Sequence, residues 1–295
     1  MTGLFGTMRI PFLPLNPICV VLAVAAAAYA GGEVNVHGVW LALIGAVAAS
    51  ITVNALNEYI DFRNGLDLQT VRTPFSGGSG TLPAHPELAR PTLIMALLSL
   101  STVVLIGAWL LIEHGLALLP IGLAGVLLIA FYSTWVVHRP IICLLAPGFG
   151  FGTLMVLGTA WVATGQFSAT TFAASLIPFF LVSNLLLLNQ FPDVDADRRV
   201  GRNTLPIAFG SRTASYVYLG FVLLGAASLG LSIWLAWLPP GTAVGLIGFA
   251  LAVPVFGGAL RYGEDIDRLK PYMALNTIIC LATPLLVAGG LFYST

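Results

Sequence analysis

The sequence predicts an all-α integral membrane protein with nine transmembrane helices, and three observations support that prediction. Of the 295 residues, 58% are hydrophobic and only 8% are charged, whereas soluble proteins carry about 25% charged residues. Apolar stretches of about 17 to 25 residues, long enough to cross a bilayer, recur along the chain. The few charges gather between these stretches instead of spreading through them. We interpret residues 1–295 as a single polytopic domain.

The predicted helices follow one another with short breaks. The first is separated from the second by Gly31-Gly32, the third from the fourth by His114-Gly115, the fifth from the sixth by Thr164-Gly165, and the seventh from the eighth by Pro239-Pro240-Gly241. Glycine and proline are the usual breakers of regular structure. The second and sixth helices each end in an acidic cluster. The nine predicted helices cover residues 12–31, 38–60, 91–112, 115–134, 140–164, 168–190, 213–236, 241–260 and 271–292.

The distribution of basic residues predicts the orientation in the membrane. Loops rich in Lys and Arg stay on the cytoplasmic side, and with nine helices every basic residue falls on one side. The loops on the other side carry only the acids Glu33 and Glu113. We therefore expect a bacterial or archaeal inner or plasma membrane protein with a cytoplasmic N-terminus and an external C-terminus. The basic residues are Arg9, Arg63, Arg72, Arg90, Arg139, Arg198, Arg199, Arg202, Arg212, Arg261, Arg268 and Lys270.

Two acidic clusters carry the chemistry that the sequence suggests. They are NALNEYIDFRNGLD at 54–67 and NQFPDVDADRRVGRNTLP at 189–206. Ionisable groups at a membrane boundary are costly and mark function by default. The helices that they follow run in the same direction, which suggests an internal duplication with both clusters facing one central cavity. The formal net charge of zero gives no electrostatic support for a nucleic-acid partner.

Helix geometry groups the polar residues of each cluster. Residues at i, i+3 and i+4 share a face, so Asn54, Asn57 and Asp61 should lie on one side of the second helix. Asp67 lies beyond Gly65, and the chain must turn to bring it back. In the second cluster, Pro192 suits the first turn of a new helix. Asn and Asp oxygens are the ligands that Mg²⁺ prefers, and Mg²⁺ often shares its ligands with a substrate diphosphate.

These motifs identify a resemblance to the UbiA superfamily of intramembrane prenyltransferases across essentially the whole chain. It rests on two Asp-rich motifs, N-x-x-x-D-x(5)-D and N-x-x-x-D-x-x-x-D, after the second and sixth of nine helices. The string NEYIDFRNGLD followed by RTPFSGGSG looks most like the dihydroxynaphthoate branch of menaquinone synthesis. The chain differs from that branch at Pro192, where Arg is common, at Glu58, where Asp is common, and at Phe151, where Glu is common.

The resemblance implies an Mg²⁺-dependent transfer of a prenyl group from an isoprenyl diphosphate to an aromatic acceptor, a quinone precursor such as dihydroxynaphthoate. It implies two Mg²⁺ ions, catalytic roles for Asp61, Asp67, Asp193 and Asp197, and lipid around the enzyme. The metal-site residues would be these four with Asn57 and Asn189, which also contact substrate. Candidates for further diphosphate contacts are Arg72, Tyr132, Arg139 and Arg198, and Arg9 stands where the family often has a basic residue.

Other readings of the same residues stay open. A cation-coupled transporter would also combine repeats with acids, although carrier sites usually lie near the bilayer midplane. A prenyltransferase with a non-quinone acceptor is a second alternative. A CDP-alcohol phosphotransferase is weaker, because the DGxxAR pattern is absent. The segment 76–80, SGGSG, could either cradle phosphate with its backbone amides or act as a flexible hinge.

Overall fold

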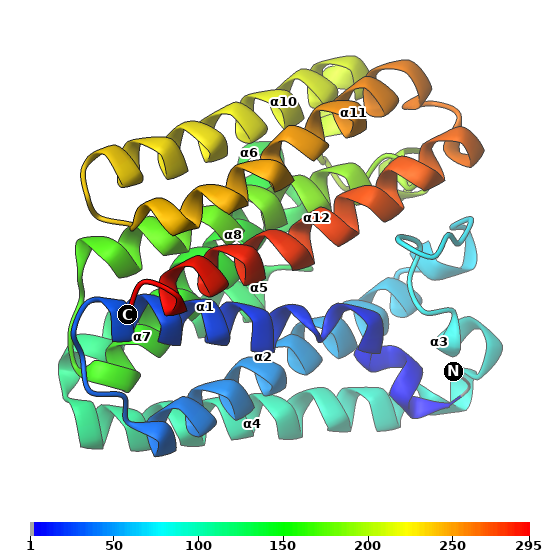
Figure 1. The fold of residues 1–295 in the computed structure, drawn as a ribbon. Coiled ribbons are helices and arrows are strands. Elements are labelled where there is room, and N and C mark those ends of the chain that lie inside the picture. The colour runs from blue at the N-terminus through cyan, green and yellow to red at the C-terminus, as the bar shows by residue number, and fades with distance from the viewer. Residues whose placement is uncertain (1–2) are drawn as a thin grey trace.

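The computed structural model describes residues 3–295, and within them every regular element is helical (Figure 1). Short 3₁₀ turns join the longer helices, and a π-helix spans Phe149–Val156 between α6 and α7. The α-helices are α1 Leu15–Tyr29, α2 Val36–Arg63, α3 Thr81–Ala84, α4 Ala89–His114, α5 Leu119–Phe131, α6 Pro140–Gly148, α7 Leu157–Thr164, α8 Ala169–Asn189, α9 Val194–Arg199, α10 Leu205–Trp234, α11 Leu246–Tyr262 and α12 Ile266–Phe292.

Seven helices of the described chain are long and apolar enough to cross a membrane. An eighth crossing is possible if the N-terminal segments Leu4–Phe12 and Leu15–Tyr29, bent by 43° where they meet, count as one. The apolar helix Leu116–Phe131 is shorter. The predicted all-helical membrane architecture is therefore confirmed, whereas the count of nine crossings stays a prediction that depends on these last two segments.

The burial pattern separates a central helix from a peripheral one. In the most apolar stretch of 18 residues, 72% of α8 is buried inside the protein, against 11% of the helical segment Pro86–His114 that contains α4. Leu98, Leu105 and Ile112 recur every seven residues on α4 and are 65%, 70% and 83% exposed. A stripe of exposed large aliphatic side chains would be unfavourable in water. It is the surface expected of a helix that contacts lipid.

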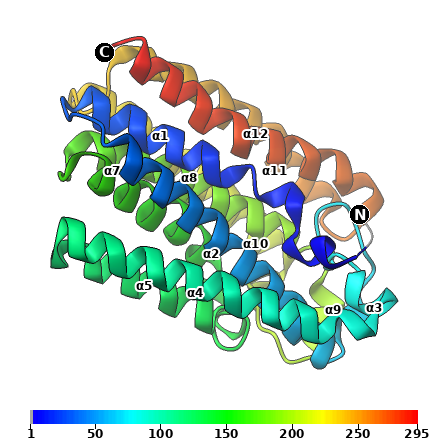
Figure 2. The same ribbon diagram turned by 90° about the horizontal axis from the view of Figure 1, so that it is seen from below.

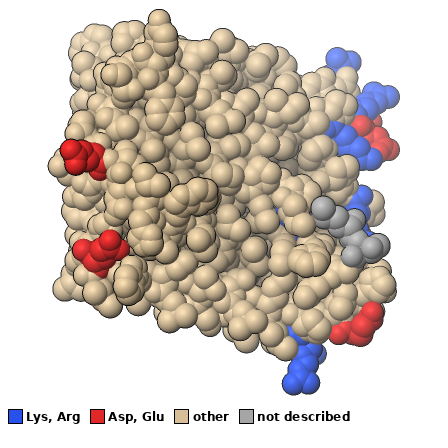
Figure 3. Space-filling view, turned by 60° about the horizontal axis from the view of Figure 1, so that its bottom comes forward, with Lys and Arg blue, Asp and Glu red and all other residues tan. Residues whose placement is uncertain are grey.

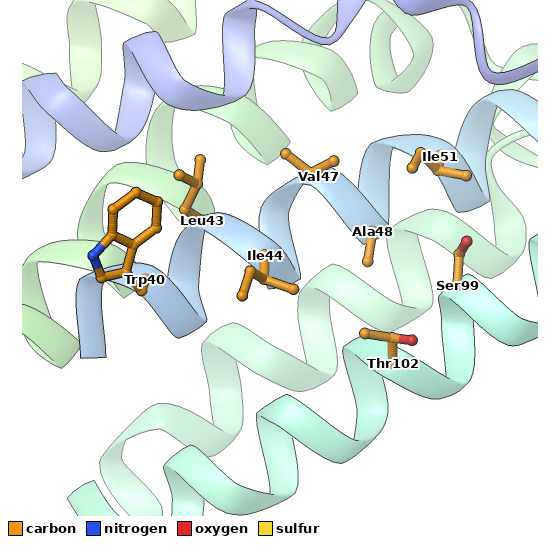
Figure 4. A pocket seen from close by; sticks show the side chains of 8 residues that line it. All are labelled: Trp40, Leu43, Ile44, Val47, Ala48, Ile51, Ser99 and Thr102. Carbon is orange, nitrogen blue, oxygen red and sulfur yellow. The ribbon is translucent and has the colours of Figure 1, made fainter. Parts of the chain in front are cut away.

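A shallow groove between α2 and α4 opens on this apolar surface and measures about 390 Å³ (Figure 4). Its lining holds two hydroxyl groups and no ionisable side chain, so it offers no group for acid, base or metal chemistry. The groove therefore does not compete with the charged end of the bundle as a candidate active site. It is lined by Trp40, Leu43, Ile44, Val47, Ala48, Ile51, Ser99 and Thr102.

Two glycines, Gly148 at the end of α6 and Gly152 in the π-helix that follows, let this part of the chain pack closely against α8. A Cβ atom at Gly152 would lie 2.5 Å from the Phe179 backbone nitrogen, and Gly148 is packed equally closely against the same residue. Only a residue without a side chain permits this approach of two backbones. The contact, together with packing of α8 on α1, α10 and α12, fixes the axis of α8 and hence the position of Asn189 at its end.

Charge collects at one end of the helices. On the face shown in Figure 3, all visible Lys and Arg side chains lie at one end, and two acidic patches lie at the other. The short helices α3 and α9 and the N-terminal 3₁₀ helix Leu4–Met8 occupy the basic end (Figure 2). The C-terminus lies at the opposite end of the bundle (Figure 1). This segregation is the arrangement that the positive-inside rule requires of a chain with one orientation.

We predict that the basic end faces the cytoplasm. Cysteines introduced at Glu33 and Glu113 should react with an impermeant thiol reagent from outside, and a cysteine at Arg90 should react only after the membrane is opened. Burial of the native Cys19, Cys143 and Cys280 keeps them from interfering. Labelling of position 90 in sealed cells, with no labelling at 33 and 113, would reverse the orientation.

Candidate active site

The first acidic motif lies at the end of α2 and in the turn that follows it. Asn57 and Asp61 are buried on the last turns of the helix. Gly65 then adopts a left-handed conformation with φ 80°, which suits glycine. The 3₁₀ turn Leu66–Leu68 that follows carries Asp67 back into a buried position. A Cβ atom at Gly78 would lie within 3.3 Å of both Asp67 and Glu58, so the turn brings Asp67 back to the end of α2.

The second acidic motif lies between α8 and α10. Asn189 ends α8, and Asp193 occupies the N-cap position of α9, whose Asp197 is buried. We expected a helix to start at Pro192, but α9 begins two residues later at Val194. Backbone turns at 190–193, in which the Asp193 amide donates to Gln190 O at 3.3 Å, separate the two helices. Pro192 therefore lies in the turn that orients Asp193.

One arginine joins the two motifs. The Arg202 guanidinium donates to Asp61 through Nη2 and to Asp197 through Nη1, the latter at 3.1 Å. Its side chain is only 12% exposed. A buried charge is tolerated when it is paired and hydrogen-bonded, and here each partner comes from a different motif. Arg202 thus holds the end of α2 against α9.

Glu58 organises the other side of the site. Its side chain is completely buried and accepts a hydrogen bond from Arg9 Nε at 2.7 Å. Ser79 donates to it twice, from the backbone amide and from the hydroxyl, each at 2.7 Å. Arg9 also donates to Asn57 Oδ1 at 3.1 Å. The N-terminal segment, α2 and the loop before α3 are therefore held together by one carboxylate.

The glycine-rich loop 76–80 connects the two motifs. The Gly77 amide donates to Asp193 Oδ2 at 3.3 Å, while Ser79 is bound to Glu58 of the first motif. Gly78 lies against Asp67, where a Cβ atom would be 2.8 Å from Oδ1. Gly77, Gly78 and Gly80 all have positive φ. The loop amides therefore bind carboxylates in this structure, and the phosphate-binding and hinge roles that the sequence suggests stay predictions.

The motif carboxylates outside the membrane-spanning helices have raised pKa values, which means that their ionised form is disfavoured. Burial, followed by repulsion from Glu58 and Asp61, raises the pKa of Asp67 to about 7. Burial, followed by repulsion from Asp197, raises the pKa of Asp193 to about 7. For Asp197, burial raises the pKa to about 6 although Arg202 opposes the shift. Bound cations would relieve this cost, because they favour the ionised form.

Several buried oxygen atoms in the motifs have no hydrogen-bond partner. They are Oδ2 of Asp67, Oδ1 of Asp193 and Oδ1 of Asn189. Such atoms call for a ligand or a bound ion. Within residues 3–295 no three His, Cys, Asp or Glu side chains converge on one point. Mg²⁺ nevertheless fits this donor set, since it is commonly held by one or two carboxylates, waters and substrate phosphates.

The remaining candidates from the sequence differ in their exposure and in their neighbours. Tyr132 is within electrostatic range of Arg202, Arg9 and Asp197. Arg139 is exposed and stacks 5.8 Å from the Trp135 ring centroid.

The two other candidate arginines also lie at the edge of the site. Arg72 is exposed, and its guanidinium packs on Gly80. Arg198 is 58% exposed and pairs with Asp195 at 3.6 Å, away from the buried carboxylates.

Sequence reasoning did not select the two residues that the structure places most centrally. From the sequence, Arg202 stands out only as a topogenic charge and as the basic residue after the second cluster, and Glu58 only as a departure from a family pattern. Arg202 is five residues after Asp197, outside the i+3 and i+4 spacing used to group side chains. The chain turns back at Gly201, φ 80°, and this turn brings Arg202 to Asp197. The glycine at position 201, between Asp197 and Arg202, is the feature of the sequence that could have indicated this turn.

We predict that Mg²⁺ binding strengthens as the pH rises through about 7, because protons compete for Asp67 and Asp193. Without metal, raised pKa values mean that the folded protein binds more protons than the unfolded chain between about pH 4 and 7, so stability falls as the pH rises across that interval. The Mg²⁺-induced rise in unfolding temperature should be larger at pH 8 than at pH 5.5.

The matched variants are Asp67→Asn and Asp195→Asn. The first removes a buried carboxylate of the site and should reduce the pH dependence of the Mg²⁺ effect. The second removes an exposed carboxylate, 84% accessible, and should leave the effect unchanged. An equal Mg²⁺ response of both variants at both pH values would contradict the assignment.

Comparisons with known proteins agree with the resemblance found in the sequence. The model of the UbiA prenyltransferase family matches residues 18–278. A Mycobacterium tuberculosis protein named 1,4-dihydroxy-2-naphthoate octaprenyltransferase is 27% identical over 273 residues, which are 86% of this chain and 84% of that protein. A Bacillus subtilis protein of the same name is 28% identical, and the match spans 60% of each chain.

Solved structures share the fold. A UbiA homolog from Archaeoglobus fulgidus bound to GPP and Mg²⁺ has a TM-score of 0.61 at 14% identity, covering 97% of this chain and 99% of that one. An apo UbiA homolog from Aeropyrum pernix has a TM-score of 0.67 at 17% identity and covers 99% of both chains. The family match spans most of the sequence and the fold agrees over nearly all of it. The chain therefore belongs to the UbiA prenyltransferase family and is an enzyme of that class.

Proposed function

We propose that residues 1–295 form one domain that transfers a prenyl group from an isoprenyl diphosphate to an aromatic acceptor in the membrane. The observation that carries this proposal is the meeting of two Asp-rich motifs at one end of the bundle, bridged by Arg202, with orphaned oxygens on Asp67, Asp193 and Asn189. That constellation suits a cation and a polyanion together, and the bundle around it supplies an apolar environment for a prenyl tail.

In this proposal two Mg²⁺ ions are bound by the two motifs, with Asn57, Asp61 and Asp67 as ligands on one side and Asn189, Asp193 and Asp197 on the other. When bound, Mg²⁺ neutralises charge that develops on the diphosphate leaving group. Arg202 and Arg9 lie beside these residues and can donate to phosphate oxygens, since a guanidinium fork matches them. Each arginine would exchange part of its present carboxylate contacts for the substrate.

The reaction breaks the bond between the allylic carbon and the diphosphate oxygen, and the electron pair leaves with diphosphate. An electron-rich aromatic carbon forms the new carbon–carbon bond and then loses its carboxylate as CO₂, or a proton where that carbon carries hydrogen, and the electron pair of the broken bond restores the aromatic ring. Exclusion of water protects the allylic cation from hydrolysis. In this chain the loop 76–80 lies against both motifs and is placed to limit solvent access to them.

The relatives favour a quinone precursor as the acceptor. The Mycobacterium tuberculosis and Bacillus subtilis proteins are both named for 1,4-dihydroxy-2-naphthoate. A non-aromatic acceptor is the alternative, because a Natronomonas pharaonis protein named digeranylgeranylglyceryl phosphate synthase is 26% identical over 68% of this chain. The position of the motifs argues against a transporter, since Asp61 lies near the end of α2 and Asp193 beyond the end of α8.

Product analysis tests the reaction directly. Purified protein with Mg²⁺ should be incubated with prenyl diphosphates of several lengths and, in parallel, with dihydroxynaphthoate, hydroxybenzoate or geranylgeranylglyceryl phosphate. We expect mass spectrometry to find a prenylated naphthoate-derived product. Product only with the glycerol phosphate would favour the second acceptor, and no product with any pair would overturn the proposal.

The two motifs should both be required. We predict that Asp61→Ala and Asp193→Ala each abolish turnover while leaving the protein folded, and that chelation of divalent cations does the same to the wild type. Asp195→Ala is the matched control, because Asp195 belongs to the same segment but is exposed. Full activity in a correctly inserted Asp61→Ala and Asp193→Ala double variant would remove the metal-site assignment.

Arg198 and Arg202 can be distinguished kinetically. The sequence proposed Arg198 as a diphosphate contact, and the structure places Arg202 between the motifs. A charge-assisted hydrogen bond contributes about 1.5–3 kcal/mol, so loss of the contacting arginine should raise the apparent KM for the prenyl diphosphate by roughly tenfold or more. We expect this effect for Arg202→Ala and a smaller one for Arg198→Ala. Arg268→Ala removes an exposed arginine that pairs with Asp265 outside both motifs, and it should change neither KM.

A further inference from the structure

Besides the apolar groove between α2 and α4, the protein has a polar pocket at the basic end of the bundle, outside the candidate active site. It measures about 570 Å³, and its lining residues come from α10 near Gly210, from the end of α11 and from the connection between α11 and α12. Figure 1 shows these segments at the same end of the bundle. Ser211 and Arg212 line it from α10, and Arg261 and Glu264 line it from the other side. None of these residues takes part in the chemistry proposed above.

The pocket carries arginines without carboxylate partners. Among the ion pairs of residues 3–295, none involves Arg212 or Arg261. Arg261 lies 5.3 Å from the centroid of the Tyr262 ring. Asp265 also lines the pocket but is paired with Arg268 at 3.2 Å, which leaves Glu264 as the acid without an ion pair that opposes the two guanidinium groups. When Arg268 is counted with the lining residues, three arginines face two acids, so the pocket region carries one net positive charge.

The backbone adds to this charge. Gly210 has φ 83° and ψ 156°, which interrupts α10 so that a new helical run starts at Ser211. The first amides of a helix have no partner within it and favour an anion. Ser211 and Arg212 are the first residues of this run, so a hydroxyl, a guanidinium and the N-terminal end of a helical run lie at one wall of the pocket.

The helices next to the pocket present an apolar surface to lipid. Tyr216 of α10 is 50% exposed and packs on Phe256 of α11 with ring centroids 5.7 Å apart. Leu223 is 59% exposed and Val253 is 48% exposed further along the same two helices. Aromatic residues near the boundary followed by aliphatic residues are typical of the interface and core of a bilayer.

We propose that this pocket binds the headgroup phosphate of an anionic phospholipid whose acyl chains lie along α10 and α11. Basic pockets between helices on the cytoplasmic side bind such headgroups, and guanidinium groups match phosphate oxygens. The continuous apolar surface selects a diacyl lipid over a free anion, because a soluble phosphate gains nothing from it.

The pocket also touches the second acidic motif. Gly263 packs on Phe191, and a Cβ atom there would lie 3.1 Å from the ring. Phe191 is buried and precedes Asp193 by two residues. A lipid headgroup in the pocket thus rests on the same connection that supports the second motif.

Native mass spectrometry of the full-length protein in detergent tests the proposal. With equimolar phosphatidylglycerol and phosphatidylcholine, the wild type should retain phosphatidylglycerol preferentially. The Arg212→Gln and Arg261→Gln double variant should bind it at least about tenfold more weakly, which is about 1.4 kcal/mol. Arg63→Gln with Arg90→Gln is the matched control, since both arginines are exposed near the same end but do not line the pocket.

The control should bind like the wild type. Each single pocket variant should also show a partial loss, which keeps the test informative if the double variant is unstable. Equal retention of phosphatidylglycerol by the pocket and control variants would overturn the proposal. Displacement of the lipid by inorganic phosphate at equal concentration would also overturn it, because it would show that a free anion suffices.

Discussion

The arrangement of this protein depends on pairing carboxylates that are buried where helices leave the membrane. Asp61, Asp197 and Glu58 are removed from solvent, and each is met by a guanidinium group. An unpaired charge at such a position would cost several kcal/mol. Because Arg202 reaches carboxylates of both motifs, the end of α2 and the short helix α9 are held together by the same interaction that makes their burial tolerable.

The same pairing leaves the site incomplete, which is what a binding site requires. Oxygen atoms of Asp67, Asp193 and Asn189 stay buried without partners, and the pKa values of the two aspartates are raised by burial and by repulsion from neighbouring carboxylates. A protein that maximised stability would satisfy or remove these groups. The fold tolerates these unsatisfied groups because the helices that carry them are also held by other contacts, such as the close packing of Gly148 and Gly152 on α8.

The loop 76–80 links local backbone chemistry to the assembly of the site. Positive φ at three glycines lets the chain fold closely over Asp67 and direct the amides of Gly77 and Ser79 to opposite motifs. A side chain at Gly78 would collide with Asp67. The loop thus hydrogen-bonds Glu58 and Asp193, while Arg202 bonds Asp61 and Asp197. Two separate sets of contacts therefore join the two motifs.

The sequence alone determined the all-helical membrane class, the clustering of charge at one end and the two motifs, because hydrophobic length and charge segregation are local properties of the chain. Only the tertiary structure decided which charges meet. Arg202 and Arg198 are four residues apart and chemically identical, yet one enters the site and the other pairs with Asp195 in solvent. That difference depends on the turn at Gly201 and on the distance to α2, and neither can be obtained from spacing along one helix.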